Sequence, residues 1–186
     1  MTPDLREASQ RRLQALLDNS SDCEVRGTIS IIYEQLTHLT WVPGYRDNNT
    51  SPKSKHWKLV IQLGFDKFVL EFLENNQESH EGLVLVSPYT PSMKKYNTYL
   101  LGNIVINMLT FYRDISFMLT NCTAYSITNC NCQHFVQGFL FLYAKCFETR
   151  TELLTEILDM IPHKVTKRAV LASMCSNGSQ VHSSSP

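Results

Sequence analysis

The sequence predicts an α+β domain in which a small antiparallel sheet packs against a helix that carries a cysteine at its N-terminus. Three observations lead to this prediction. Two apolar runs flank a short turn, apolar residues recur at helical spacing elsewhere, and an Asn-Cys step at 131–132 stands directly before a strongly apolar run. The first pattern is typical of a β-hairpin, and the others indicate amphipathic helices.

Length and composition are those of one globular domain. The chain has 186 residues, of which 43% are hydrophobic and 18% are charged, so it can bury a substantial core. We therefore expect a single domain over residues 1–175. The segment 176–186 is polar and rich in Ser, which predicts a disordered tail.

Charge and apolar runs limit the possible partners and locations. Lys plus Arg equals Asp plus Glu at 17 each, so no overall field would attract nucleic acid. We find neither a signal-type stretch nor a run of about 18 apolar residues, so we expect a cytoplasmic protein without a transmembrane segment. The six cysteines are irregularly spaced and are expected to be mostly reduced. The sequence does not indicate the oligomeric state.

The first elements are predicted by composition and spacing. Leucines among polar residues over 4–18 favour an amphipathic helix, and β-branched residues over 24–39 favour a strand. Polar residues and a proline over 46–53 predict a loop.

A β-hairpin follows. Its predicted strands span 56–63 and 67–72, on either side of a Gly-Phe-Asp turn at 64–66. The apolar run 82–86, closed by Ser87-Pro88, predicts a third strand.

The remaining elements are predicted to be helical. Apolar residues at three- and four-residue spacing predict helices over 99–117 and 151–160. Between them, Asn131 is a good N-cap for a helix whose apolar stripe includes Phe135 and Phe139. The expected order is thus three strands, a helix and the cysteine helix.

Cys132 is the candidate nucleophile. It falls in the first turn of its helix, where unpaired N–H groups and the helix dipole lower a thiol pKa below the ~8.5 of a free cysteine. His134 follows by two positions and points roughly to the opposite side. The base is therefore expected from another element.

His56 and Glu71 are the candidates for the other two catalytic positions. Thiol catalysis needs a histidine that takes the proton and usually a third polar group that orients the ring. His56 opens an apolar strand, where a rigid sheet can hold its ring toward the cysteine helix, and Glu71 lies on the neighbouring strand of the hairpin. We predict Cys132, His56 and Glu71 as the catalytic residues.

Other interpretations of these residues remain open. Cys132 could be an inert buried thiol, because free cysteine is among the most buried residue types. Gln62 and Gln133 are rivals for the orienting or oxyanion-binding role. Glu71 could simply be a solvated strand residue.

A metal cluster is a further alternative. Cys122, Cys130, Cys132 and His134 lie close in sequence, but their spacing lacks the paired C-x2-C units of zinc sites. We expect neither a metal nor an organic cofactor.

The residues around His56 and Cys132 resemble a known group of enzymes. His56-Trp57 begins the hairpin, and the sequence from Tyr125 to Val136 has the form Asn-Cys-x-His-Phe-Val at its end. This arrangement resembles the circularly permuted papain-like thiol enzymes, which include lecithin:retinol acyltransferase-like phospholipase/acyltransferases and desumoylating isopeptidases. The resemblance spans 56–143. Acyltransferase-like members commonly have a second histidine where Glu71 stands here.

The resemblance implies a permuted papain-like fold and a cysteine-dependent hydrolase or acyltransferase. Such an enzyme acts on an ester or amide through an acyl-thioester, with an acyl lipid or a protein conjugate as substrate. One alternative is an isopeptidase for ubiquitin-like conjugates, in which the loop 45–55 would help to form a groove. The other is a noncatalytic interaction domain that retains the fold.

Overall fold

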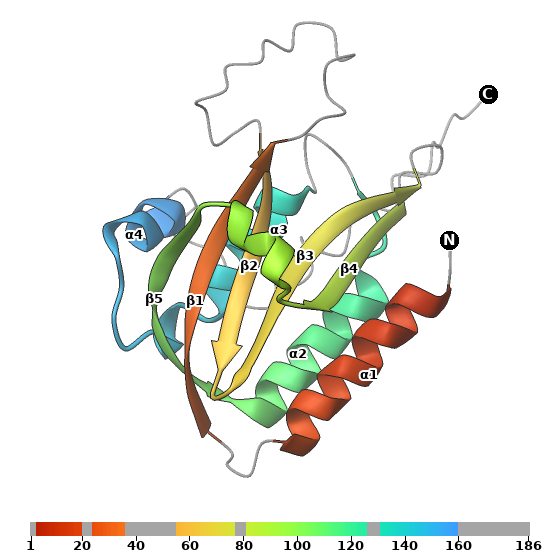
Figure 1. The fold of residues 1–186 in the computed structure, drawn as a ribbon, viewed down its shortest axis with the longest axis horizontal. Helices are drawn as coiled ribbons and strands as arrows, with labels where there is room; N and C mark the ends of the chain where they lie inside the picture. The colour runs from red at the N-terminus through yellow and green to blue at the C-terminus, as the bar shows by residue number, and fades with distance from the viewer. Residues whose placement is uncertain (1–2, 20–23, 36–54, 77–80, 126–130, 160–186) are drawn as a thin grey trace, which may run out of the picture.

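A computed structural model describes residues 3–19, 24–35, 55–76, 81–125 and 131–159 (Figure 1). These residues form a five-stranded antiparallel sheet with the strand order β4-β3-β2-β1-β5, together with four α-helices. The strands are β1 (Glu24–Gln35), β2 (Lys55–Leu63), β3 (Asp66–Asn76), β4 (Glu81–Pro88) and β5 (Thr98–Asn107). The helices are α1 (Pro3–Asn19), α2 (Met108–Asn121), α3 (Cys132–Leu142) and α4 (Glu152–Asp159), with short 3-10 turns η3 (Pro91–Lys95) and η4 (Ala144–Cys146).

The helices cover one face of the sheet. In Figure 1, α1 and α2 run side by side near β4, and α3 lies behind β2. Alternate strand residues point to this face and meet the apolar sides of the helices, which forms the main core. Phe111 of α2 is central, since its ring lies 6.0 Å from that of Phe68 on β3 and 6.4 Å from that of Phe139 on α3. The cysteine helix is therefore fixed to the sheet by buried aromatic contacts.

The opposite face of the sheet has a second, smaller core. Ile32, Val60 and Val69 lie there on three adjacent strands. Tyr89, Met93 and Tyr96, from the segment that contains η3, pack against them. The central strands are thus buried on both faces, which suits their continuous apolar runs.

Most of the predicted elements are confirmed. The α+β class with a small antiparallel sheet is correct, and α1, α4 and the β2–β3 hairpin match their predicted ranges closely. The predicted third strand is β4. The predicted strand 24–39 is β1 up to Gln35, while 36–39, the loop 46–53 and the tail 176–186 lie outside the described residues.

The helix predicted over 99–117 is wrong in its first half. Residues Thr98–Asn107 form β5, and α2 begins only at Met108, where the Asn107 side chain caps it by accepting from the Thr110 N–H at 2.9 Å. Ile104 and Ile106 are fully buried while Asn103 and Asn107 are exposed, so the true period is two. The open edge of β1 supplies the pairing that overrides the helical spacing.

We expect Phe111→Ala to lower the free energy of unfolding by about 3–5 kcal/mol, because it removes a fully buried ring that touches both the sheet and α3. Leu109→Ala is the matched control on the same helix. Its side chain is 64% exposed, so the change should stay within about 0.5 kcal/mol. Urea unfolding followed by circular dichroism measures both, and equal effects would contradict this packing.

Candidate active site

The Asn131 side chain fixes the start of α3. Its Oδ1 accepts hydrogen bonds from the backbone N–H groups of Gln133 at 2.9 Å and His134 at 3.1 Å, as expected of an N-cap. The His134 ring adds Nδ1 at 2.9 Å from the same oxygen. Cys132 is consequently held as the first residue of the helix, and its own N–H is not used by the cap. The His134 ring therefore contacts the cap.

The Cys132 thiol meets the sheet where β2 and β3 stop pairing. The ladder between these strands ends at Lys58↔Glu71, although β2 continues back to Lys55 and β3 continues to Asn76. Beyond that point the backbone of Trp57 forms a hydrogen bond with the Cys132 thiol. The sulfur is thus bound by a backbone group of β2 that lies just outside the β2–β3 ladder.

His56 joins the thiol to Glu71. The imidazole is hydrogen bonded to the Cys132 side chain, and its Nε2 lies 3.2 Å from Oε2 of Glu71. Since Nε2 faces the carboxylate, Nδ1 is the nitrogen left for the thiol. The structure therefore brings together all three predicted residues. Their catalytic role stays a prediction.

Lys58 is a fourth member of the cluster that the sequence analysis missed. Its Nζ lies 3.1 Å from the same Oε2 of Glu71 that faces His56. Lys58 is two residues after His56 on β2 and pairs with Glu71 across the ladder, so the three side chains share one face of the sheet. The period of two in a strand was the signal that could have identified it.

Burial and hydrogen bonding act against each other on the three ionisable groups. Burial alone would lower the pKa of His56, but its hydrogen bonds to Cys132 and Glu71 and their negative charges raise that pKa to about 9. Burial would raise the pKa of Cys132, but the hydrogen bond and charge of His56 lower it, helped by Trp57 and Tyr125. Burial also opposes ionisation of Glu71, whose pKa is lowered by His56 and Lys58.

These directions favour one charge state of the pair. With the thiol pKa lowered and the imidazole pKa raised, a thiolate and an imidazolium can coexist near neutral pH. Such an ion pair is the reactive form of a cysteine nucleophile.

Tyr125 is also in contact with Cys132. Its hydroxyl forms hydrogen bonds with both the side chain and the backbone of Cys132. Tyr125 begins the motif in the sequence, but no role was predicted for it. No local signal would have identified this contact, because it depends on the path of the chain after α2.

Of the two rival candidates, Gln62 lies far from His56, and the role of the Gln133 side chain stays a prediction. Gln62 is exposed near the β2–β3 turn, where its Nε2 lies 3.5 Å from the Gly64 carbonyl oxygen. Six residues of strand separate it from His56, or roughly 20 Å. The backbone N–H of Gln133 belongs to the Asn131 cap.

The metal alternative has no support within the part of the chain that the structure describes. No group of three or more His, Cys, Asp or Glu side chains there could hold a metal ion. Cys122, Cys132 and Cys146 are free thiols. Cys130 lies outside the described residues.

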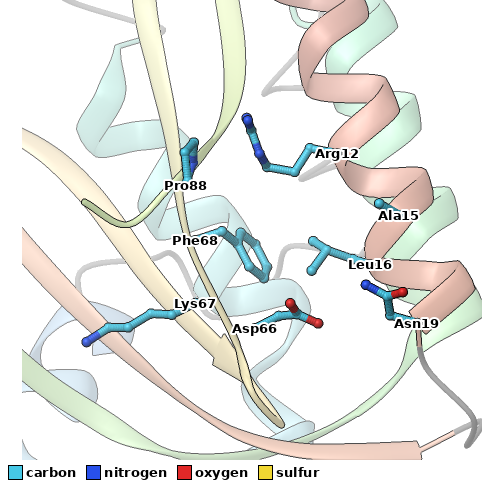
Figure 2. Close-up of a pocket in the computed structure, with 8 residues that line it drawn as sticks. All are labelled: Arg12, Ala15, Leu16, Asn19, Asp66, Lys67, Phe68 and Pro88. Carbon is cyan, nitrogen blue, oxygen red and sulfur yellow. The ribbon is translucent and has the colours of Figure 1, made fainter. Parts of the chain in front are cut away.

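A surface pocket lies at the other end of the sheet (Figure 2). Asp66 and Arg12 contribute its charged side chains, between the β2–β3 turn and α1, whereas the Lys67 side chain points away from it. The Arg12 guanidinium donates to the Val86 carbonyl at 2.7 Å, and Lys67 Nζ lies 4.0 Å from the centroid of the Tyr89 ring. Both cations therefore have partners within the protein, and the pocket is remote from the thiol.

We expect the alkylation of Cys132 by iodoacetamide to have a pH midpoint below the ~8.5 of a free cysteine, because His56 stabilises the thiolate. Cys132 is only 2% exposed, which slows the reaction at every pH, but the pH midpoint of the rate still reports the thiol pKa. His56→Asn should move it upward. Peptide mass spectrometry follows Cys132 and, as an internal control, the half-buried Cys146. The interaction is refuted if both cysteines share one midpoint in the native protein.

We expect Glu71→Gln to lower the pKa of His56 from about 9, because the substitution removes a charge that favours the imidazolium. The pKa of His56 lies above the ordinary value of ~6.5. The stabilisation by the His56 imidazolium is therefore complete below about pH 6.5 and is lost as the pH rises through about 9. Glu71→Gln should lose this stabilisation at a lower pH than the native protein. NMR titration of the imidazole measures the shift.

Glu24→Gln is the control for this measurement, since Glu24 is an exposed residue at the far end of β1, where it pairs with Asn107. The pKa of His56 should not change in that variant. An unchanged pKa in Glu71→Gln would show that the carboxylate does not act on the ring.

Comparison of the chain with protein families, curated proteins and solved structures finds no match. No helix among the described residues is long and apolar enough to cross a membrane. The geometry around Cys132 is therefore the basis for a proposed function.

Proposed function

We propose that the protein is a cysteine-dependent hydrolase or acyltransferase that acts on an ester or amide through an acyl-thioester. One observation carries the proposal: the Cys132 thiol, at the N-terminus of α3, is hydrogen bonded to His56, whose other ring nitrogen lies 3.2 Å from Glu71. A nucleophile, a base and a group that orients the base are thus connected in the order that covalent catalysis requires.

In the first step the Cys132 thiolate attacks the carbonyl carbon of the substrate. The C–S bond forms, and the electron pair of the carbonyl π bond moves onto oxygen. The helix N-terminus favours this charge, because the Cys132 N–H is not used by the Asn131 cap. Collapse of the intermediate breaks the bond to the leaving oxygen or nitrogen, which takes a proton from the His56 imidazolium.

The second step releases the acyl group. Neutral His56 removes a proton from water or another acceptor, which attacks the thioester carbonyl and displaces the sulfur. Glu71 keeps the ring oriented and favours its protonated form in both steps. His56 and Lys58 together favour the ionised form of Glu71 although only 7% of that residue is exposed.

The proposal includes a permuted papain-like arrangement with an acyl lipid or a protein conjugate as substrate. The histidine precedes the cysteine in the chain, and the strand bearing His56 packs against the helix bearing Cys132. This order is the one in the enzymes that the sequence resembles. An isopeptidase for ubiquitin-like conjugates remains an alternative, and its predicted groove loop 45–55 lies almost entirely outside the described residues.

A noncatalytic domain is a second candidate, and one observation favours it. Cys132 is 2% exposed and His56 is 6% exposed, so a substrate carbonyl reaches the sulfur only if covering groups move. An interaction domain would not need this movement. The two candidates differ in whether Cys132 can be acylated.

We expect p-nitrophenyl acetate to form a thioester at Cys132, with an initial burst of nitrophenolate, because the thiolate is the strongest nucleophile of the cluster. Intact mass and peptide mapping locate the acetyl group. Cys132→Ser should abolish the thioester, and His56→Asn should slow its formation by about 10²–10⁴-fold. Cys146→Ser is the matched control and should acylate normally.

Absence of the thioester, in protein whose Cys132 is alkylated by iodoacetamide, would support the noncatalytic domain. If the thioester forms, phosphatidylcholine and a ubiquitin-like conjugate distinguish the enzymes. A fatty-acyl adduct on Cys132 supports the lipid enzyme. Cleavage of the conjugate without such an adduct supports the isopeptidase.

A further inference from the structure

We propose that the Tyr125 hydroxyl is the side-chain donor of the oxyanion hole, acting together with the backbone N–H of Cys132. This inference rests on the proposed function and assigns a catalytic role to a residue outside the Cys132, His56 and Glu71 set.

The position of Tyr125 is fixed by contacts on two elements. The chain leaving α2 pairs with the start of β4, through the Gly82 N–H to the Thr123 carbonyl at 2.7 Å and a bridge between Glu81 and Ala124. A Cβ at Gly82 would lie 2.5 Å from the Phe72 ring and 3.2 Å from the Ala124 backbone, so the glycine permits this close approach. The segment is therefore held against the sheet up to the residue before Tyr125.

The Tyr125 ring is packed beside the cysteine helix. Its centroid lies 5.3 Å from that of Phe72 on β3, and Phe72 in turn stacks on Phe135 of α3 at 5.5 Å. Phe135 is one turn after Cys132. The stack thus places the phenol next to the start of α3.

The hydroxyl makes two different hydrogen bonds with Cys132. It accepts from the backbone N–H and donates to the side chain. The Asn131 side chain accepts hydrogen bonds from the N–H groups of Gln133 and His134. The Asn131 backbone carbonyl accepts one from the Phe135 N–H. The Cys132 N–H is therefore directed to the phenol, where both donors converge beside the sulfur.

This geometry matches the redistribution of charge during acylation. Before attack the negative charge is on sulfur, to which Tyr125 donates. As the C–S bond forms, the charge moves to the carbonyl oxygen. The hydroxyl can then redirect its hydrogen toward that oxygen, and the Cys132 N–H exchanges the phenol oxygen for the same oxyanion. Burial, followed by the charge of Cys132, raises the pKa of Tyr125 far above its usual range, so the hydroxyl keeps its proton.

The test compares two reactions of Cys132 in Tyr125→Phe. Acylation by p-nitrophenyl acetate develops an oxyanion, whereas alkylation by iodoacetamide does not. We expect the acylation rate to fall by about 10²–10³-fold, and the alkylation rate to stay within about threefold at its high-pH plateau. Plateau rates are compared because loss of a donor to sulfur also raises the pKa of Cys132.

The substitution keeps the ring, so the contact with Phe72 can persist, and the alkylation plateau reports an intact site in the same sample. Tyr112→Phe, a half-buried tyrosine on α2, is the matched control and should leave both rates unchanged.

Each other outcome overturns the assignment. Unchanged acylation in Tyr125→Phe shows that the hydroxyl is not an oxyanion donor. An equal fall in both plateau rates shows that Tyr125 only positions the thiol. If the native protein is alkylated but never acylated, the proposed function fails as well, and this result is distinct because it already appears without any substitution.

Discussion

The site depends on the early end of the ladder between β2 and β3. Trp57 packs into the helix-covered core, so His56, its neighbour on β2, projects from the opposite face of the sheet. A continuous ladder would separate that imidazole from a thiol on α3. Because pairing ends at Lys58↔Glu71, the Cys132 sulfur can form a hydrogen bond with the Trp57 backbone. It also forms a hydrogen bond with His56, beyond the last pair of the ladder. The register of two strands therefore decides whether nucleophile and base can meet.

The buried polar cluster is costly for stability, which strengthens the functional interpretation. His56 and Glu71 are 6% and 7% exposed, and removing charged groups from water costs several kcal/mol per ion before pairing compensates. Farther along β2 and β3, the same face of the sheet carries the apolar side chains of Val60 and Val69. Apolar residues at positions 56 and 71 would therefore suit a sheet with a purely structural role. Perturbed ionisable groups that contact a cysteine at a helix N-terminus are instead typical of catalytic sites.

Local chemistry made part of this arrangement predictable. The Asn131 cap and the place of Cys132 follow from residues within one helical turn, and the turn at 64–66 sets the register that brings Glu71 near His56. The residues Thr98–Asn107 were assigned wrongly because their pairing with β1 joins segments 66 to 83 residues apart in the chain, and spacing alone does not reveal such a partner. The contact of Tyr125 with Cys132 is likewise set by packing between elements.

The Asn131 cap connects the position of the nucleophile to its electrostatics. One side-chain oxygen accepts from the N–H groups of Gln133 and His134 and also lies within hydrogen-bond distance of the His134 ring. These contacts fix the first turn, and they also leave the Cys132 N–H as the one directed toward the phenol of Tyr125. An aspartate could cap the helix equally well, but its charge beside the sulfur would oppose thiolate formation. The neutral amide therefore suits a helix that begins with a thiol of lowered pKa.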